Sequence, residues 1–296
     1  MGRKVGSFGS FKTVGADQTV TFTQNEIPSR GLVALHIGAF KSGAGLSDIG
    51  LAPGAMKRIK LKAGNRPIID IPAERLIAYM ERFSLANKSY GESAVEHATN
   101  DFSYHFTLPL HFLDTADEDI ADLCQFPANS PATLEIETGG NMETGTTIGV
   151  AWTVTDTAPA FFPLLLNQKL NFGASATRQR SIVHQDGVLR GIGIPYSELG
   201  RLEIWQDGEL QFDAQGLASS GSFECNLIAE TQGVHAPYPT DVIANGDHLF
   251  VGIDNGIPVR RGEGTVLYAD TGASWATTGP DDEITVYSVV PLNAAA

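Results

Sequence analysis

The stretch Arg201–Ala214, RLEIWQDGELQFDA, contains two runs in which apolar and polar side chains alternate. Alternation with a period of two is typical of a strand that buries one face. The pair Asp207-Gly208 separates the two runs. Asp-Gly is favoured in the two-residue type I′ turn that joins antiparallel strands. The stretch therefore predicts a β-hairpin.

Strand patterns of this kind, rich in β-branched and aromatic residues, recur along the chain. Many strands at near-regular spacing, with few helices between them, favour β-sandwiches or barrels over a βαβ fold. In the strand expected at 56–64, Met56 shares a face with Arg58, Lys60 and Lys62, which leaves the burial of that strand open. The other expected strands lie at 18–26, 31–40, 66–71, 104–112, 132–138, 147–156, 187–194, 247–254, 264–270 and 283–290.

Two short segments predict helices. In Asp70–Ala86, DIPAERLIAYMERFSLA, Pro72 suits the first helical position, and apolar residues recur at i, i+1, i+4 and i+7 from Leu76. In 114–126, DTADEDIADLCQF, a capping residue precedes three acids in the first turn, where the helix dipole favours anions.

The chain of 296 residues is long enough for two sandwiches. A boundary is expected near Asp156–Pro163, DTAPAFFP, where a strand pattern ends and two prolines follow. We therefore expect an all-β protein of two β-sandwiches in tandem with a few short helices. The expected parts are a flexible basic arm at 1–16, sandwiches at 17–156 and 157–291, and a C-terminal tail at 292–296.

The charge is unevenly distributed along the chain. The net charge is −14, yet residues 1–90 hold 13 Lys and Arg against 6 Asp and Glu, whereas 91–296 hold 7 against 28. So acidic a protein is not expected to bind nucleic acid directly. The arm at 1–16 carries Arg3, Lys4 and Lys12 without an acid, so it is either a contact for an anionic surface such as phospholipid headgroups or a solvated tail.

Several classes of protein are not expected. No apolar run reaches the ~18 residues of a membrane-spanning helix, and no apolar segment follows Arg3 and Lys4 as in a signal peptide. The two cysteines, Cys124 and Cys225, make neither a disulfide framework nor a zinc site. Nucleophile-elbow, P-loop, zinc-protease and dinucleotide-binding motifs are all lacking from the sequence.

Two histidines in YHFTLPLHF, at 104–112, first suggest a metal or acid–base site. Strand periodicity places His105 and His111 on the polar face, opposite an aromatic and aliphatic face. Six residues of strand separate them by about 20 Å, so they cannot hold one metal ion together.

Three other groups of residues are weighed for chemistry. Asp270-Thr271-Gly272 resembles the aspartic-protease signature, but that chemistry needs two aspartates, and the motif occurs once. Asp281-Asp282-Glu283 and the acids of 114–122 can offer oxygen ligands to Ca²⁺, although neither has EF-hand spacing and both are explained by solvation. No other cofactor is expected.

Trp205, flanked by three acids, is the one patch that suggests carbohydrate binding or glycosidase chemistry. Glycosidases need two carboxylates about 5–9 Å apart. The acids are Glu203, Asp207 and Glu209, and the predicted hairpin accounts for them more simply.

Taken together, the chain resembles the double jelly-roll major capsid proteins of icosahedral phages with an internal membrane, the tectivirus- and corticovirus-like lineage. The resemblance rests on FTLPLHFLDTADEDIADL at 106–123, followed by PATLEIET at 131–138, and on RPIIDIPAERLIAYMERFS at 66–84. It extends over about 17–291, in two all-β halves.

The resemblance implies two jelly rolls side by side and three chains in a pseudo-hexagonal trimer that tiles an icosahedral shell around a lipid membrane. It implies a virion protein, made in the host cytoplasm, without catalytic residues. Its partners would be neighbouring capsomers, vertex (penton) proteins and minor membrane proteins. The arm with Arg3, Lys4 and Lys12 would face the membrane lipid.

Two further expectations accompany the resemblance. Trp152, Trp205 and Trp275 are candidates for packing between sandwiches, with the interior of one sandwich as the simpler reading. Acidic trimers repel one another, so the shell is expected to depend on salt or divalent cations. The alternatives are a jelly-roll carbohydrate-binding protein or glycosidase, or a binding module without a virion role.

Overall fold

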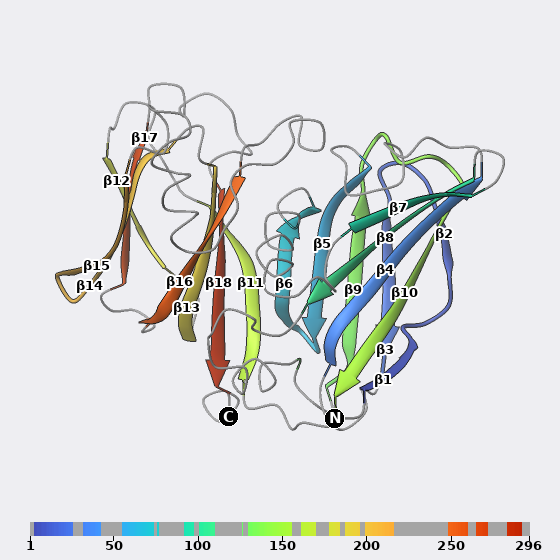
Figure 1. The fold of residues 1–296 in the computed structure, drawn as a ribbon, viewed down its shortest axis with the longest axis horizontal. Coiled ribbons are helices and arrows are strands. Elements are labelled where there is room, and N and C mark those ends of the chain that lie inside the picture. Colours follow the sequence, from blue (N-terminus) through green and yellow to red (C-terminus); the bar gives the residue numbers. More distant parts are fainter. Residues whose placement is uncertain are drawn as a thin grey trace. The chain divides into compact units, whose positions relative to one another are not determined.

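The chain divides into two compact units, whose described residues lie mostly in strands (Figure 1). Unit 1 is Met1–Leu164 with Val290–Ala296, and unit 2 is Leu165–Val289. The computed structural model describes residues 3–25, 32–42, 55–73, 76, 92–97, 101–109, 126, 130–155, 161–169, 178–183, 187–195, 199–215, 248–259, 265–271 and 283–291. The all-β class predicted from the sequence is confirmed.

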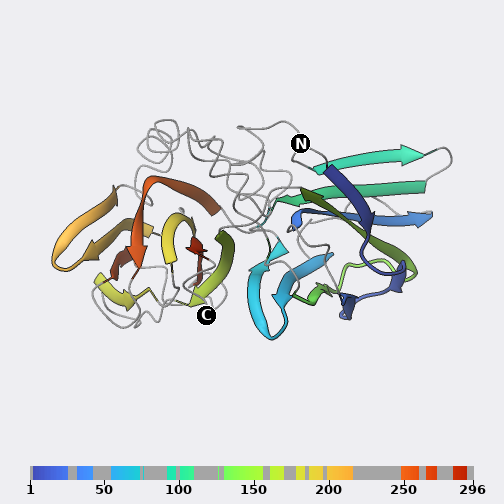
Figure 2. The ribbon, with the colours of Figure 1, turned by 90° about the horizontal axis from the view of Figure 1, so that it is seen from below.

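Unit 1 is built from two antiparallel sheets. Its strands are β1 (Arg3–Ser7), β2 (Lys12–Val14), β3 (Thr19–Gln24), β4 (Leu32–Ser42), β5 (Met56–Ala63), β6 (Arg66–Pro72), β7 (Glu92–His97), β8 (Asp101–Pro109), β9 (Ala132–Thr138) and β10 (Thr146–Thr155). One sheet has the order β1-β10-β4-β8-β7, with β2 also on β10, and the other contains β6-β5-β9-β3. Figure 2 shows the layer with β5 and β6 (cyan) across from the layer with β4, β7 and β8.

The core of unit 1 lies between these sheets. In β9, every second residue from Ala132 to Thr138 is buried. Ile59 and Leu61 of β5 continue this apolar layer, and Leu35 and Ile37 of β4 supply the facing one. Complete burial of a side chain of this size stabilises the fold by about 1.5–3 kcal/mol.

A register shift between Met56 and Arg58 decides which face of β5 is buried. Met56 is buried on the side of Ile59 and Leu61, whereas Lys60 and Lys62 lie on the other side and are only half-buried. Strict alternation had placed Met56 with the lysines. A bulge adds one residue to a strand and so reverses the faces on either side of it.

Unit 2 also contains two antiparallel sheets. The strands that lie wholly or mostly in it are β11 (Phe161–Lys169), β12 (Arg178–Ile182), β13 (Gly187–Pro195), β14 (Leu199–Gln206), β15 (Glu209–Gln215), β16 (His248–Val259), β17 (Val266–Thr271) and β18 (Glu283–Pro291). One sheet has the order β12-β17-β14-β15, and the other contains β16-β13-β18-β11. Every side chain from Ile284 to Val290 is buried.

The hairpin predicted at Arg201–Ala214 is confirmed. β14 pairs with β15 in antiparallel register, and Asp207 and Gly208 connect them. Their φ angles are 51° and 84°. Two positive φ angles are what a type I′ turn requires.

Two predictions of local structure differ from the structure, and a third is not tested by it. Asp70–Pro72, predicted to begin a helix, end β6, and helical conformation is first seen at Ala73 and again at Leu76. The boundary expected near Asp156–Pro163 overlaps the start of β11, because Pro163 lies within the strand although proline usually marks a break. The helix predicted at 114–126 lies outside the described residues, apart from a non-helical Phe126.

Candidate functional site

Residues 3–14, predicted as part of a flexible arm, form β1 and β2 along one edge of β10. β1 pairs with Ala151–Thr155 and β2 with Thr146–Ile148, and the Phe8 amide donates to the Val150 carbonyl at 2.8 Å. The Phe8 side chain is completely buried. The prediction of flexibility is therefore wrong for these residues. β1 and β2 are too short to show a clear alternation in the sequence, and the edge of β10 that they complete cannot be seen there.

Two glycines let aromatic rings lie against the backbone of this N-terminal segment. The Trp152 ring covers Gly6, which is its partner in register, and the indole Nε1 donates to the Ser7 carbonyl at 3.0 Å. The Phe11 ring lies against Gly149. Aromatic rings that cover strand glycines fix pairing at a sheet edge. Trp152 thus packs within unit 1, in agreement with the simpler reading.

The three cations predicted for membrane contact have different surroundings. The Lys12 ammonium donates to the Thr21 carbonyl and lies 5.5 Å from the centroid of the Phe22 ring. Lys12 of β2 therefore contacts β3, which belongs to the other sheet, and its charge already has partners within unit 1. For Arg3 and Lys4 the structure gives the backbone pairing, with Thr155 and Val154.

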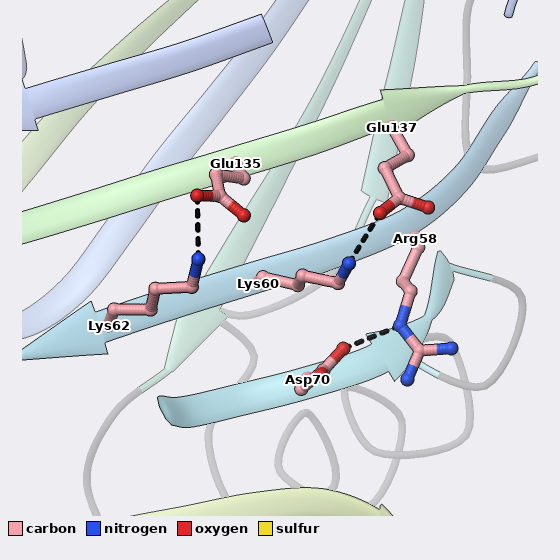
Figure 3. A network of polar contacts seen from close by, with 6 residues as sticks. All are labelled: Arg58, Lys60, Lys62, Asp70, Glu135 and Glu137. Carbon is pink, nitrogen blue, oxygen red and sulfur yellow. Dashed lines mark hydrogen bonds and ion pairs between the residues drawn. The ribbon is translucent and has the colours of Figure 1, made fainter. Parts of the chain in front are cut away.

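A row of three ion pairs crosses β6, β5 and β9 (Figure 3). The atoms are Arg58 Nε with Asp70 Oδ1 at 2.5 Å, Lys60 Nζ with Glu137 Oε1 at 2.5 Å, and Lys62 Nζ with Glu135 Oε1 at 2.7 Å. We call these six residues the ion-pair ladder. Its side chains are 22–33% exposed. Cations from β5 alone meet acids from both neighbouring strands, so the ladder favours this strand order and register.

The outer face of the opposite sheet is built differently. Residues that pair in register point to the same side, and the core-facing residues of β4 and β10 are Ile37 and Val150. The outward positions are therefore Val5 and Ser7 of β1, Phe11 and Thr13, alternate residues of Ala34–Phe40 and Thr147–Thr153, and His105 and Thr107. None of these positions carries Asp, Glu, Lys or Arg, although register also places Arg3 of β1 and Asp101 of β8 on this side, each at the first residue of its strand. We call them the neutral face.

His36 connects three strands on the neutral face. Its Nδ1 lies 3.0 Å from Thr107 Oγ1 in β8, and its Nε2 lies 2.7 Å from Thr153 Oγ1 in β10. Burial lowers the pKa of His36 below its ordinary value. In the neutral ring, one nitrogen donates to a threonine and the other accepts from the second hydroxyl.

Strand β8, which contains His105, shows the predicted alternation at the residues whose exposure the structure describes. In β8, Leu108 is completely buried, and His105 is exposed. His111 lies outside the described residues. His105 therefore belongs to an exposed sheet face, as the periodicity predicted.

The candidate protease and calcium residues do not form a recognisable site. Asp270 and Thr271 end β17, which pairs with strands on both sides, and Gly272 lies outside the described residues. Glu283 begins β18, while Asp281, Asp282 and the acids of 114–122 lie outside. Among the described residues, no group of three or more His, Cys, Asp or Glu can hold a metal ion. In the same part of the chain, no helix is long and apolar enough to cross a membrane.

Trp205 is held inside its own sheet. Its Nε1 donates to Glu203 Oε2 at 2.7 Å, and its ring meets Tyr268 edge to face at 6.5 Å between centroids. Glu203 is only 3% exposed, whereas Asp207 and Glu209 lie exposed at the turn. The half-buried indole thus stabilises the sheet and is poorly placed as a sugar platform. Trp275, Cys124 and Cys225 lie outside the described residues.

Sequence reasoning missed the ion-pair ladder, the neutral face and the role of His36. The alternation of Lys60 and Lys62 with apolar residues, matched by Glu135 and Glu137, is a signal that could have found the ladder. The neutral face depends on which strands are neighbours, and a single sequence does not give that.

No protein-family model and no curated protein matches the sequence. Solved structures do resemble it. The major capsid protein P2 of bacteriophage PM2 has a TM-score of 0.64 at 12% identity, covering 98% of this chain and 97% of that one. The major capsid protein of STIV, the Sulfolobus turreted icosahedral virus, has a TM-score of 0.63 at 10% identity, covering 100% and 98%. The Faustovirus major capsid protein has a TM-score of 0.51 at 8% identity, covering 97% and 89%. The chain therefore has the double jelly-roll fold that these major capsid proteins share.

Proposed function

We propose that the chain is a major capsid protein, a structural protein without enzymatic activity whose copies tile the shell of an icosahedral virion. The observation that carries the proposal is the extent of the likeness. At least 97% of this chain matches at least 89% of each capsid protein compared, so both jelly rolls are included. A tandem pair of jelly rolls matched from end to end is far more specific than a single one.

The proposal includes the assembly expected for such a chain. Three copies form a pseudo-hexagonal capsomer, and capsomers contact one another, vertex proteins and minor membrane proteins. The jelly rolls occupy 17–156 and 157–291, and an internal lipid membrane lies beneath the shell. Arg3 and Lys4, on opposite faces at the start of β1, are the cations offered to its headgroups, whereas Lys12 contributes less because its ammonium is already bonded within unit 1.

The carbohydrate-binding alternative has little support. It depends on Trp205 as an exposed platform, and the indole N–H and one edge of the ring are used within the sheet. We therefore propose no second function.

The mass of the purified protein tests the proposal. A trimer has three times the chain mass of 31.5 kDa, about 95 kDa, and mass photometry separates it clearly from the monomer. Electron microscopy of the same sample should show pseudo-hexagonal particles or arrays. A protein that stays monomeric at every concentration, salt and divalent-cation condition tried would refute the proposed function.

A further inference from the structure

The two outer faces of unit 1 differ sharply in charge. One carries the six ionic side chains of the ion-pair ladder. The residues that define the neutral face carry none, in a chain of net charge −14, and the charged positions on the same side, Arg3 and Asp101, lie at strand ends. Strand surfaces exposed to water normally carry charged residues, and a lack of charge characterises the centre of protein interfaces.

The neutral face also exposes large apolar side chains. Phe11 is 78% exposed, Val5 70% and Phe40 43%. They lie on neighbouring strands, because Phe40 pairs with Thr147, Phe11 lies against Gly149, and Val5 pairs with Thr153. Grouped apolar exposure of this kind marks a contact surface more often than scattered single residues do.

We propose that the neutral face is a contact surface for a second copy of this chain. Two copies with net charge −14 repel each other. Contact costs least where no ion pair and no unpaired charge has to lose its water. Apart from Arg3 at the start of β1, no described position on this side carries a cation, so the middle of the face is a poor match for anionic lipid or for nucleic acid. The inference rests on the proposed function, because a shell protein must contact its own copies.

The shape of the face suits a protein partner. Gly38 pairs with Gly149 in its middle, so two neighbouring strands lack side chains there. Phe11 lies against Gly149 rather than at the tip of a hairpin, where a membrane anchor would project. His36 hydrogen-bonds to Thr107 through one ring nitrogen and to Thr153 through the other, so both nitrogens already have partners before a second copy covers them.

Paired substitutions of exposed threonines test the inference. Thr13→Glu adds a carboxylate to the neutral face, and Thr23→Glu adds the same group to β3 in the opposite sheet. Phe11→Ser removes the most exposed apolar group. We expect Thr13→Glu and Phe11→Ser to raise the dissociation constant of the oligomer ~10-fold or more. Thr23→Glu should change it by about twofold or less. Mass photometry over a dilution series gives the constants, and circular dichroism during heating confirms that each variant folds.

Each outcome separates the inference from the function on which it rests. If the wild type assembles and Thr13→Glu and Phe11→Ser assemble equally well, the inference fails and the proposed function stands. Equal weakening by Thr13→Glu and Thr23→Glu also overturns it, because the effect then lies in charge alone. If the wild type never associates, the proposed function itself fails. Flotation with phosphatidylserine vesicles that is lost in Phe11→Ser, without any change in assembly, would assign the face to lipid instead.

Discussion

Replacing Gly6 by alanine should destabilise unit 1, because the Trp152 ring occupies the space of the new methyl group. A Cβ at Gly6 would lie 2.2 Å from Cζ2, 2.5 Å from Cε2 and 2.8 Å from Cη2 of that ring. Carbon atoms pack best at about 3.5–4.0 Å, so the ring must move by more than about 1 Å. The 3.0 Å hydrogen bond from Trp152 Nε1 to the Ser7 carbonyl is then lost.

The cost follows from these two effects. A lost hydrogen bond costs about 1 kcal/mol, and overpacking costs about 1–3 kcal/mol. We therefore expect Gly6→Ala to lower the free energy of unfolding by about 2–4 kcal/mol, which is roughly 4–16 °C in Tm for a unit of this size.

Gly149→Ala is the matched control. Its Cβ would lie even closer to a ring, 2.1 Å from Cε1 of Phe11. That ring is 78% exposed and can rotate into water. The expected change in the free energy of unfolding is about 0.5 kcal/mol or less.

Thermal unfolding followed by tryptophan fluorescence and circular dichroism compares the variants. Adding Gly6→Ala to Trp152→Leu should cost little beyond Trp152→Leu alone, because the clash is then absent. The reasoning is refuted if Gly6→Ala is as stable as the wild type, or if Gly149→Ala is the more damaging of the two.

Three further predictions concern charge. Because burial lowers the pKa of His36 below 6.5, its neutral form stabilises the fold above that pH, and this contribution is lost as the pH falls from 6.5 through the lower folded pKa. The free energy of unfolding falls by at most about 1.4 kcal/mol per pH unit in this range. Urea unfolding at several pH values should show a smaller fall on acidification for His36→Gln than for the wild type. An equal dependence on pH in the two proteins would contradict the assignment. In the ion-pair ladder, Lys60→Glu places a carboxylate beside Glu137, its diagonal ion-pair partner, and directly opposite Glu135, and should cost about 1 kcal/mol. Adding Glu137→Lys should restore part of the stability in denaturant titrations. A double variant no more stable than Lys60→Glu would show that the pair has no such role. Association of copies with net charge −14 should weaken when divalent cations are chelated at low salt, measured by light scattering, and indifference to chelator over a broad salt range would count against it.

The sequence predicts the architecture well where strand patterns are complete in themselves. Arg201–Ala214 contains both strands and their turn, and the structure has that hairpin in the expected form. The strict alternation in β9 likewise fixes its buried face. These elements are local, so alternation and turn residues suffice to define them.

The remaining features depend on contacts between distant residues. β1 and β2 have too few residues for a periodic signal, and they exist because β10 offers an edge. The bulge beside Met56 depends on pairing with β9. Sequence reasoning could not settle the role of Trp205, because the edge-to-face contact with Tyr268, on a strand far along the chain, helps to decide what its indole can do.

The anchoring of the N-terminal segment has a consequence for the order of folding. Ser7 accepts its hydrogen bond from Trp152, which is 145 residues further along the chain. During synthesis the segment must wait, with Phe8 exposed, until its partner strand has emerged. Contacts with such large sequence separation form slowly, and an uncovered strand edge can meanwhile pair with another chain. Closing β10 with its own N-terminal residues is thus a late step, after which that side of the strand can no longer accept a strand from a neighbour.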